Sequence, residues 1–322
     1  MIFEIIVFII AVFVLSWLSS RLVATLVDIA KYLHWREFMI AFFVMAFAAS
    51  LPNLFVDINA ALHGMPQIAF GDILGGNLVD LTLVLAIAIF FGSGSLPAES
   101  EMVQKSAIFT SAVALLPIFL VWDGKLDRID GIILLGVFAF YAWWLFSKED
   151  RFKKVYQGRP QNPVKGFSSF LTNLAKIVVF LVLLLITSFF VVNSAQFFSV
   201  QLGISLSLVG ILIVGLGNCF PEIYFSIISA RRGENWMILG DLMGSVMVCA
   251  TLVLGIIALI APFQIQDLSP FMITRVFTFV ASLLFLVFIR TGKKITKIEG
   301  LIFLSIYLSF LLVEIFLPGI IK

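Results

Sequence analysis

The chain has 322 residues, of which 61% are hydrophobic and only 12% carry a charged side chain. A water-soluble protein needs a polar exterior, so this balance indicates a polytopic membrane protein. The formal net charge of +2 is small and no basic run interleaved with aromatic residues occurs, which excludes a nucleic-acid partner.

The first segment, MIFEIIVFIIAVFVLSW, has neither a basic start nor a small-residue cleavage site. We therefore expect a retained first membrane helix whose N-terminus lies on the non-cytoplasmic side. A spanning helix needs roughly 20 mostly apolar residues. The chain divides into ten such segments, which predicts an all-α fold: residues 2–30, 36–62, 67–92, 104–122, 129–147, 168–197, 205–230, 236–262, 270–290 and 298–318.

Lys and Arg residues concentrate in the loops on one side of these ten segments. The excess of cations in cytoplasmic loops then places both termini outside and the longest polar loop, residues 147–167, in the cytoplasm. We expect an integral protein of the cell membrane. The loop would join a first five-helix repeat, residues 1–146, to a second, residues 168–322.

An internal repeat relates the two halves. A shift of 169 positions superimposes residues 39–91 on residues 208–260 without a gap, and six of the 13 identical residues are Gly, Pro, Asp or Thr. Because each half has five spans, an odd number, equivalent spans would cross in opposite directions. We therefore predict two inverted repeats with a site between them near the membrane midplane.

Both repeats carry Pro and Gly inside apolar spans. These residues free backbone groups from the helix ladder, which hydrocarbon tolerates only where the broken region faces protein or water. Broken spans of this kind hold ions in many transporters. The alternative is that Pro and Gly merely kink packed helices, but their recurrence beside carboxylates in both halves favours a site.

The repeated motifs resemble those of a known family. SLPN with GDILGGNLVDLTLVLA, and CFPE with GDLMGSVMVCATLVLG, are similar to the two alpha repeats of the cation/calcium exchanger superfamily, the sodium/calcium antiporters. The resemblance implies exchange of Ca²⁺ against Na⁺ or H⁺. It also implies that the first and sixth helices slide to give alternating access.

The resemblance assigns cation ligands position by position. Glu222 matches one of two central glutamates, whereas Asn53 stands at the other. The hydroxyl positions of the Gly-rich turns are Gly76 and Ser245, and one turn further, where the family has Asn or Asp, stand Asp80 and Cys249. Ala49 and Ser50, and Asn218 and Cys219, stand where the family usually has Thr and Ser. The cation ligands implied are Glu222, Asp80, Asn53, Ser50, Asn218, Cys219, Ser245 and Cys249.

Helical spacing places Asn218 with Glu222 on one face, and Gly76 with Asp80 on another, so two carboxylates can converge. A lone carboxylate at mid-bilayer costs about 2.5–3.5 kcal/mol and usually has an ion, a proton or a partner group. No Lys or Arg is expected near these span centres, which favours a cation or a proton as the partner of the carboxylates. The alternative is a protonated carboxyl that serves only structure.

Three further aspartates have alternative roles. Asp57 lies one turn beyond Asn53 on the same face, so it either replaces the missing glutamate as a cation ligand or lies in an aqueous mouth. Asp72 and Asp241 follow Gly near the start of a span, where we expect them mainly to cap helix N-termini and also to attract cations.

Both cysteines, Cys219 and Cys249, fall at family ligand positions. Because thiolates prefer softer metals, a transition metal is an alternative substrate. The other interpretation is that both are small packing residues. The sequence does not predict whether the two thiols meet.

We therefore predict a secondary cation antiporter rather than an enzyme. The alternatives are a divergent member that moves another cation, and a transport-inactive structural membrane protein. An intramembrane aspartyl protease is excluded because the FGD and LGD motifs would lie at opposite membrane faces. No nucleotide motif occurs, which favours gradient-driven movement without a cofactor. The expected partners are inorganic cations and the lipid bilayer, with no obligate protein partner.

Overall fold

The computed structural model describes residues 1–32, 47, 50–147, 163–233, 235–265 and 269–316. Within this part of the chain, nine helical segments are long and apolar enough to cross a membrane, and one shorter apolar helix accompanies them. The prediction of an all-α integral membrane protein is confirmed. The predicted span 36–62 lies partly outside the described residues, and its second half is the shorter helix. Each of the other nine predicted spans coincides with one of the nine segments.

Several spans combine more than one kind of helix. Segments η2 (Asp80–Val84), η5 (Gly210–Val214) and η6 (Val248–Val253) are π-helical, and η3 (Val121–Asp123) is a 3₁₀ turn. The first half contains α1 (Ile2–Tyr32), α4 (Leu51–Leu62), α5 (Pro66–Val79), η2 (Asp80–Val84), α6 (Leu85–Phe91), α7 (Glu101–Leu120), η3 (Val121–Asp123) and α8 (Arg128–Ser147). The second half contains α9 (Pro163–Leu202), α10 (Leu206–Val209), η5 (Gly210–Val214), α11 (Gly215–Asn218), α12 (Phe220–Arg232), α13 (Asn235–Met247), η6 (Val248–Val253), α14 (Leu254–Ile260), α15 (Ser269–Gly292) and α16 (Lys297–Phe316).

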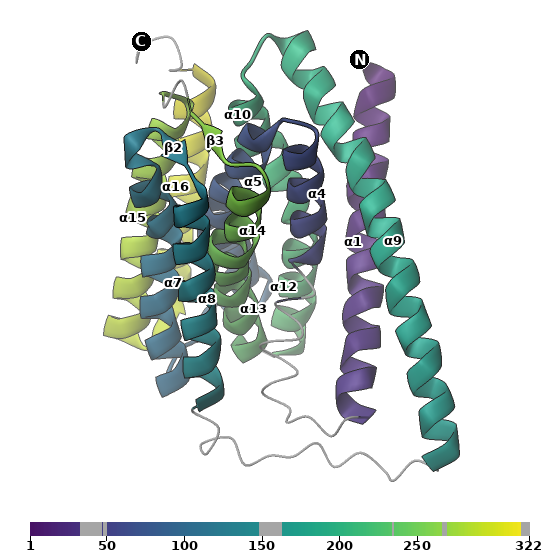
Figure 1. Cartoon of the computed structure of the whole chain (residues 1–322). Coiled ribbons are helices and arrows are strands. Elements are labelled where there is room, and N and C mark those ends of the chain that lie inside the picture. Colours follow the sequence, from purple (N-terminus) through teal and green to yellow (C-terminus); the bar gives the residue numbers. More distant parts are fainter. Residues whose placement is uncertain (33–46, 48–49, 148–162, 234, 266–268, 317–322) are drawn as a thin grey trace.

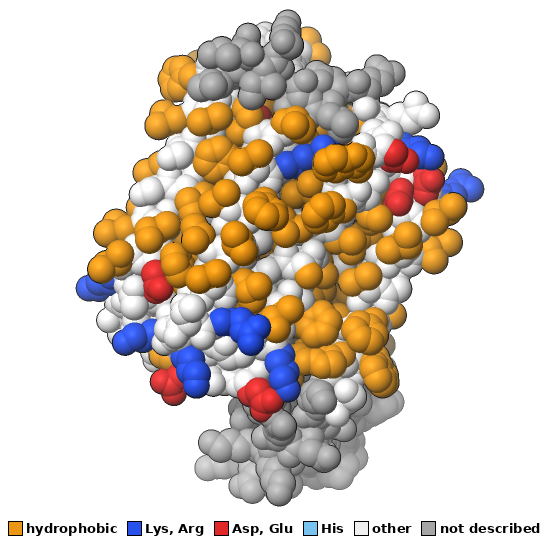
Figure 2. All heavy atoms as spheres, turned by 90° about the vertical axis from the view of Figure 1, so that its left-hand side faces the viewer, with side chains coloured by type: hydrophobic (Ala, Val, Ile, Leu, Met, Phe, Trp, Pro, Cys, Tyr) orange, Lys and Arg blue, Asp and Glu red, His pale blue; other side chains and the backbone are white. Residues whose placement is uncertain are grey.

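The two long helices α1 and α9 lie side by side at one edge of the molecule, and the remaining helices form a bundle next to them (Figure 1). Both helices expose large apolar side chains, such as Phe13 on α1 and Val182 on α9. On the face formed by the opposite side of the bundle, hydrophobic side chains cover the middle and charged ones gather mostly toward the two ends (Figure 2). This distribution suits a protein surrounded by lipid.

Two short antiparallel sheets tie the halves together. Strand β1 (Ser95–Pro97) pairs with β4 (Lys294–Thr296), and β2 (Lys125–Leu126) pairs with β3 (Phe263–Gln264). Strands β1 and β2 precede and follow α7, so the two sheets lie at opposite ends of this helix. The 169-residue shift carries β1 to the position of β3 and β2 to that of β4. Each sheet therefore pairs one strand from each half.

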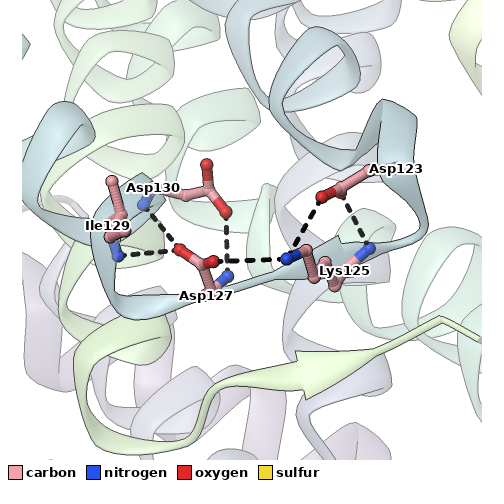
Figure 3. Close-up of polar contacts among 5 residues, drawn as sticks. All are labelled: Asp123, Lys125, Asp127, Ile129 and Asp130. Atoms are coloured by element: carbon pink, nitrogen blue, oxygen red, sulfur yellow. Dashed lines mark hydrogen bonds and ion pairs between the residues drawn. The ribbon is translucent and has the colours of Figure 1, made fainter.

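Matching caps begin the last helix of each half. The Asp127 carboxylate accepts hydrogen bonds from the backbone N–H groups of Ile129 and Asp130, while Asp130 accepts one from Asp127 N–H (Figure 3). The two backbone donors hold the pKa of Asp127 below its usual range. Thr296 and Glu299, 169 positions later, form the same reciprocal cap on α16. The repeat therefore extends beyond the segments whose sequences match most clearly.

Glycines allow the two halves to approach at backbone distance. A Cβ atom at Gly75 of α5 would overlap the backbone of Ile211 in η5, and one at Gly71 would overlap the Ser207 carbonyl oxygen. Gly210 faces the same crossing from the other half. The crossing brings the middle of α5 against the middle of the span that continues into α11 and α12.

Candidate cation site

Helix breaks mark the middle of one span in each half. Helix α4 begins directly after Ser50 with Pro52 in its first turn, and α12 begins directly after Cys219 with Pro221 in its first turn. The two breaks are equivalent under the 169-residue shift. Pro221 has no N–H group, so the carbonyl group of Gly217, four residues earlier, has no α-helical donor. These breaks are where the sequence predicts freed backbone groups.

A π-helical segment in each half accompanies the breaks. Asp80 opens η2 and Cys249 lies in η6, again at equivalent positions. In both segments a threonine hydroxyl donates to the carbonyl oxygen four residues earlier, from Thr82 and from Thr251. Single π-helical turns inside α-helices are frequent at functional sites because they change the direction of side chains.

Glu222, Asp80 and Ser245 meet in the interior, each at most 2% exposed. The Ser245 Oγ atom lies 3.5 Å from Glu222 Oε1 and within hydrogen-bonding reach of the Asp80 carboxyl group. Glu222 and Asp80 also interact electrostatically. We refer to these three residues as the central cluster. It joins a carboxyl group from the first half to a carboxyl group and a hydroxyl group from the second.

Two cysteines border the central cluster, and both are free thiols. The Cys219 thiol points at the Gly76 carbonyl oxygen with a separation of 3.6 Å, and it also reaches Asp80. Asn53 donates its Nδ2 hydrogen to Cys249 Sγ at 3.6 Å. At position 53, where the resemblance implies a glutamate, the chain therefore has an amide that contacts sulfur.

Ser50 is fully buried at the first helix break, and its carbonyl oxygen accepts a hydrogen bond from Leu54 N–H. The equivalent backbone bond in the second half runs from Ile223 N–H to the Cys219 carbonyl oxygen. Both residues belong to the turns from which the proline-containing helices start. Ala49 lies outside the described residues.

Asn218 does not share a partner with Glu222, contrary to the expectation that both occupy one helical face. Helix α11 ends at Asn218 and α12 starts at Phe220, so the regular i, i+4 geometry is interrupted at Cys219. Asn218 donates its Nδ2 hydrogen to Asp72 Oδ2 at 2.6 Å, whereas Glu222 faces Ser245.

The expected roles of Asp72 and Asp241 as helix caps are wrong. Asp72 lies in the interior of α5 and Asp241 in the interior of α13, and both are almost completely buried. Asp72 contacts Asn218, while Asp241 interacts electrostatically with Asp80 and Glu222. Sequence reasoning therefore missed both as interior acidic groups. Their repeat-related positions were the available signal.

Asp57 is fully buried, so the aqueous-mouth interpretation is wrong. Its carboxyl group lies within hydrogen-bonding reach of the Asp72 carboxyl group. Asn53, one turn earlier on the same helix, faces Cys249 instead. The acidic groups thus form two clusters rather than one.

Two oxygen atoms of the central cluster, Glu222 Oε2 and Asp80 Oδ1, have no hydrogen-bond donor, and neither does the nearby Asn53 Oδ1. Among the described residues, the ion pairs lie near the surface and none involves Glu222 or Asp80. Buried anionic oxygens of this kind are ligands that hard cations prefer. Within the described part of the chain, no three His, Cys, Asp or Glu side chains gather closely enough to form a metal centre by themselves.

Comparison with known proteins gives a consistent result. Residues 3–147 and 172–316 match the model of the sodium/calcium exchanger protein family. The chain is 26% identical over 304 residues to CaxA of Alkalimonas amylolytica, covering 92% of this chain and 93% of CaxA. It is 22% identical over 330 residues to the sodium/calcium exchanger MaX1 of Methanosarcina acetivorans, covering 92% of this chain and 93% of MaX1.

A solved structure has the same fold. It is that of the sodium-calcium exchanger NCX_Mj, which matches with a TM-score of 0.67 at 22% sequence identity. The match covers 97% of this chain and 98% of that protein.

Proposed function

The chain belongs to the sodium/calcium exchanger protein family, and from this premise we propose that it is a secondary active antiporter. It moves Ca²⁺, or a related cation, against Na⁺ or H⁺. The family is one of exchangers rather than enzymes, and its transported cations are substrates rather than cofactors.

One observation supports this function most directly: Glu222 and Asp80, from different halves, face the same Ser245 hydroxyl group in the interior. Two carboxylates are the anionic component of many Ca²⁺ sites, in which six to eight oxygens surround the ion. A bound divalent cation would offset the charge of both groups. Glu222, Asp80 and Ser245 are therefore the proposed primary ligands.

The remaining oxygens would come from neighbouring groups. Asn53 and Ser50 lie on the first broken span, and Gly76 and Gly217 offer backbone carbonyl groups near the breaks. Cys219 and Cys249 border the site with sulfur rather than oxygen. We propose them as packing neighbours of the bound ion rather than as its ligands.

Coupling follows from competition for the same charges. Two ions that both need Glu222 and Asp80 cannot be bound together, and an empty pair of ionised carboxylates is costly in the apolar middle of the membrane. The protein would then switch between the states open to either side of the membrane only when a cation is bound. This requirement converts a Na⁺ or H⁺ gradient into movement of the other cation.

The moving part would be the pair α1 and α9. Phe8 and Val12 of α1 lie against Gly217 beside the second break, and Ser188 of α9 accepts a hydrogen bond from Asn59 of α4. The pair therefore contacts both broken spans. Sliding of these two helices would open the central cluster alternately to the two sides.

We further propose ten spans in two inverted five-helix repeats, residues 1–146 and 168–322, with both termini outside and the linker 147–167 in the cytoplasm of a cell-membrane protein. Matching caps and cross-paired strands in the two halves support this arrangement. Single cysteines placed in the linker of a Cys219→Ser and Cys249→Ser background should react with a membrane-impermeant thiol reagent only after the cells are permeabilised. Labelling in intact cells would show that the linker lies outside the cell and that the proposed orientation is wrong.

Transport is tested by reconstitution of the purified protein into proteoliposomes. We expect uptake of radioactive calcium that depends on an imposed Na⁺ or H⁺ gradient. Folded protein that accumulates no calcium under either gradient, but accumulates another cation, would support the divergent-substrate alternative. Folded protein that accumulates no cation would support the transport-inactive alternative.

A further inference from the structure

A second pair of buried acidic side chains lies outside the central cluster. Asp57 of α4 is 0% exposed and Asp72 of α5 is 1% exposed. Their carboxyl groups lie within hydrogen-bonding reach of each other. The two helices are neighbours in the sequence, separated only by residues 63–65, and pack against each other.

This acidic pair has little compensation from the protein. In the described part of the chain, no ion pair involves Asp57 or Asp72, and neither oxygen of Asp57 receives a hydrogen bond. The Oδ1 atom of Asp72 also has no donor. Two ionised carboxylates in contact are unfavourable in a low-dielectric interior unless a positive charge accompanies them.

Asn218 provides an independent observation from the other half of the chain. Its Nδ2 atom donates to Asp72 Oδ2 at 2.6 Å, so the amide group is held against the acidic pair. The Oδ1 atom of the same amide is buried and has no donor. The three side chains therefore gather four buried oxygens without donors, two on Asp57 and one each on Asp72 and Asn218.

These groups have hydrogen-bond partners different from those of the central cluster, although Asp72 interacts electrostatically with Asp80 and Glu222. Asp72 precedes Asp80 by eight residues, a rise of about 12 Å along a helix. The helix break at Cys219 directs Asn218 away from Glu222, toward the end of the molecule where α4 and α5 connect. Asp72 hydrogen-bonds to Asp57 and Asn218, whereas Asp80 hydrogen-bonds to Ser245 and Cys219.

The oxygens favour a hard cation. Ca²⁺ requires six to eight oxygen ligands, and this group provides fewer than that from its three side chains. An ion with a smaller charge and a smaller demand for ligands fits better. We propose that Asp57, Asp72 and Asn218 form a second cation site, which binds Na⁺.

This site belongs to one half only. The 169-residue shift carries Asp57 to Ser226 and Asp72 to Asp241, so the second half has a hydroxyl group where the first has a carboxyl group. A Na⁺ site at the end of the molecule where α4 and α5 connect would make Na⁺ binding differ between the states open to the two sides of the membrane. That placement on a transport path rests on the proposed function, whereas binding of Na⁺ does not.

The test measures Na⁺-dependent thermal stabilisation of the full-length protein in detergent, at constant ionic strength with choline as the replacement cation. Glu222→Gln removes a carboxylate of the central cluster. We expect this variant to retain a saturable rise in the melting temperature with Na⁺. Addition of Asp57→Asn or Asp72→Asn should weaken the apparent Na⁺ affinity at least tenfold. Addition of Glu314→Gln, a buried carboxyl group on α16, should leave it unchanged.

Two results would overturn the proposal. One is a Glu222→Gln protein that has lost all Na⁺-dependent stabilisation, and the other is an unchanged Na⁺ affinity after the aspartate substitutions. If those double variants do not fold, Asn218→Leu in the Glu222→Gln background replaces them. Weaker Na⁺ binding supports the site, and unchanged binding rejects it. Because the readout is binding, a failure of cation transport in proteoliposomes would not affect this result.

Discussion

The Ser245 Oγ atom lies 3.5 Å from Glu222 Oε1, and the same hydroxyl group reaches Asp80 from the other half of the chain. A hydroxyl group has one hydrogen to donate, so it can satisfy only one of the two carboxyl groups at a time. The Cys219 thiol also reaches Asp80 but is only a weak donor, so the pair of carboxyl groups still needs a positive partner in the interior. A cation between the two groups meets this need.

Glu222→Gln is therefore expected to abolish gradient-driven calcium uptake while the protein still folds. The amide has nearly the same shape as the carboxyl group but lacks its charge. Because affinity for hard cations depends on the number of charged ligands, we expect the apparent Ca²⁺ affinity to fall at least ~tenfold, or about 1.4 kcal/mol. Uptake of radioactive calcium into proteoliposomes measures the effect.

Glu314→Gln is the matched control for this loss of charge. Glu314 is 2% exposed on α16, and its Oε2 atom has no donor, as for Glu222 Oε2. Among the described residues, no hydrogen bond or electrostatic interaction links Glu314 to the central cluster. Uptake should persist in Glu314→Gln, and equal uptake by Glu222→Gln and the unaltered protein would contradict the role of Glu222.

Most of the fold was predictable because lipid imposes strict rules on length and composition. The spans follow from roughly 20 apolar residues each, and the 169-residue repeat follows from matched Gly, Pro, Asp and Thr positions. The repeat also placed Glu222 and Asp80 on spans that meet. These inferences depend on local patterns that survive in a single sequence.

The partners of individual side chains were less predictable. Asn218 and Glu222 have helical spacing, but the break at Cys219 directs them to different clusters. Asp72 follows a glycine near the predicted start of its span, which resembles a cap, yet the helix begins at Pro66 and buries it. Both errors arose because contacts between the two halves decide which partners these side chains have. A single sequence does not show those contacts.

Gly75→Ala should destabilise the protein by about 1–3 kcal/mol, because overpacking a tight contact forces backbone shifts. A Cβ atom there would overlap the backbone of Ile211 at the crossing of the two halves. Gly136→Ala on α8 is the control, since a Cβ atom at Gly136 has no neighbour within 4 Å. The melting temperature in detergent should fall for Gly75→Ala only. A fall of equal size in both variants would show that the crossing is not tightly packed.

Replacement of both thiols tests whether sulfur binds the transported ion. Cys219 and Cys249 are held by weak contacts to Gly76 and Asn53, which suits neutral packing residues. We expect Cd²⁺ to compete with calcium uptake equally well in the unaltered protein and in the Cys219→Ser, Cys249→Ser variant. Cd²⁺ competition that weakens strongly in the variant would instead make the thiols ligands and favour a transition metal as substrate.

The cap at Asp127 predicts a pH-dependent contribution to the stability of α8. Two backbone N–H groups hold its pKa below the usual value, so the native state favours the ionised carboxylate. The contribution is therefore complete above the unfolded pKa of about 3.9 and is lost as the pH falls through the lower native pKa. At neutral pH, Asp127→Ala should lower the melting temperature, whereas Asp127→Asn should retain most of it because Asn also caps helices.

The decisive comparison is between Asp127→Ala and the unaltered protein across a pH series, with the melting temperature measured in an acid-stable detergent. Their difference should be constant near neutral pH and should disappear once Asp127 is protonated. Asp123→Ala is the matched control, since Asp123 accepts a hydrogen bond from Lys125 N–H in the preceding turn rather than from α8. A difference between Asp127→Ala and the unaltered protein that persists unchanged in acid would mean that the carboxylate charge does not stabilise the start of α8.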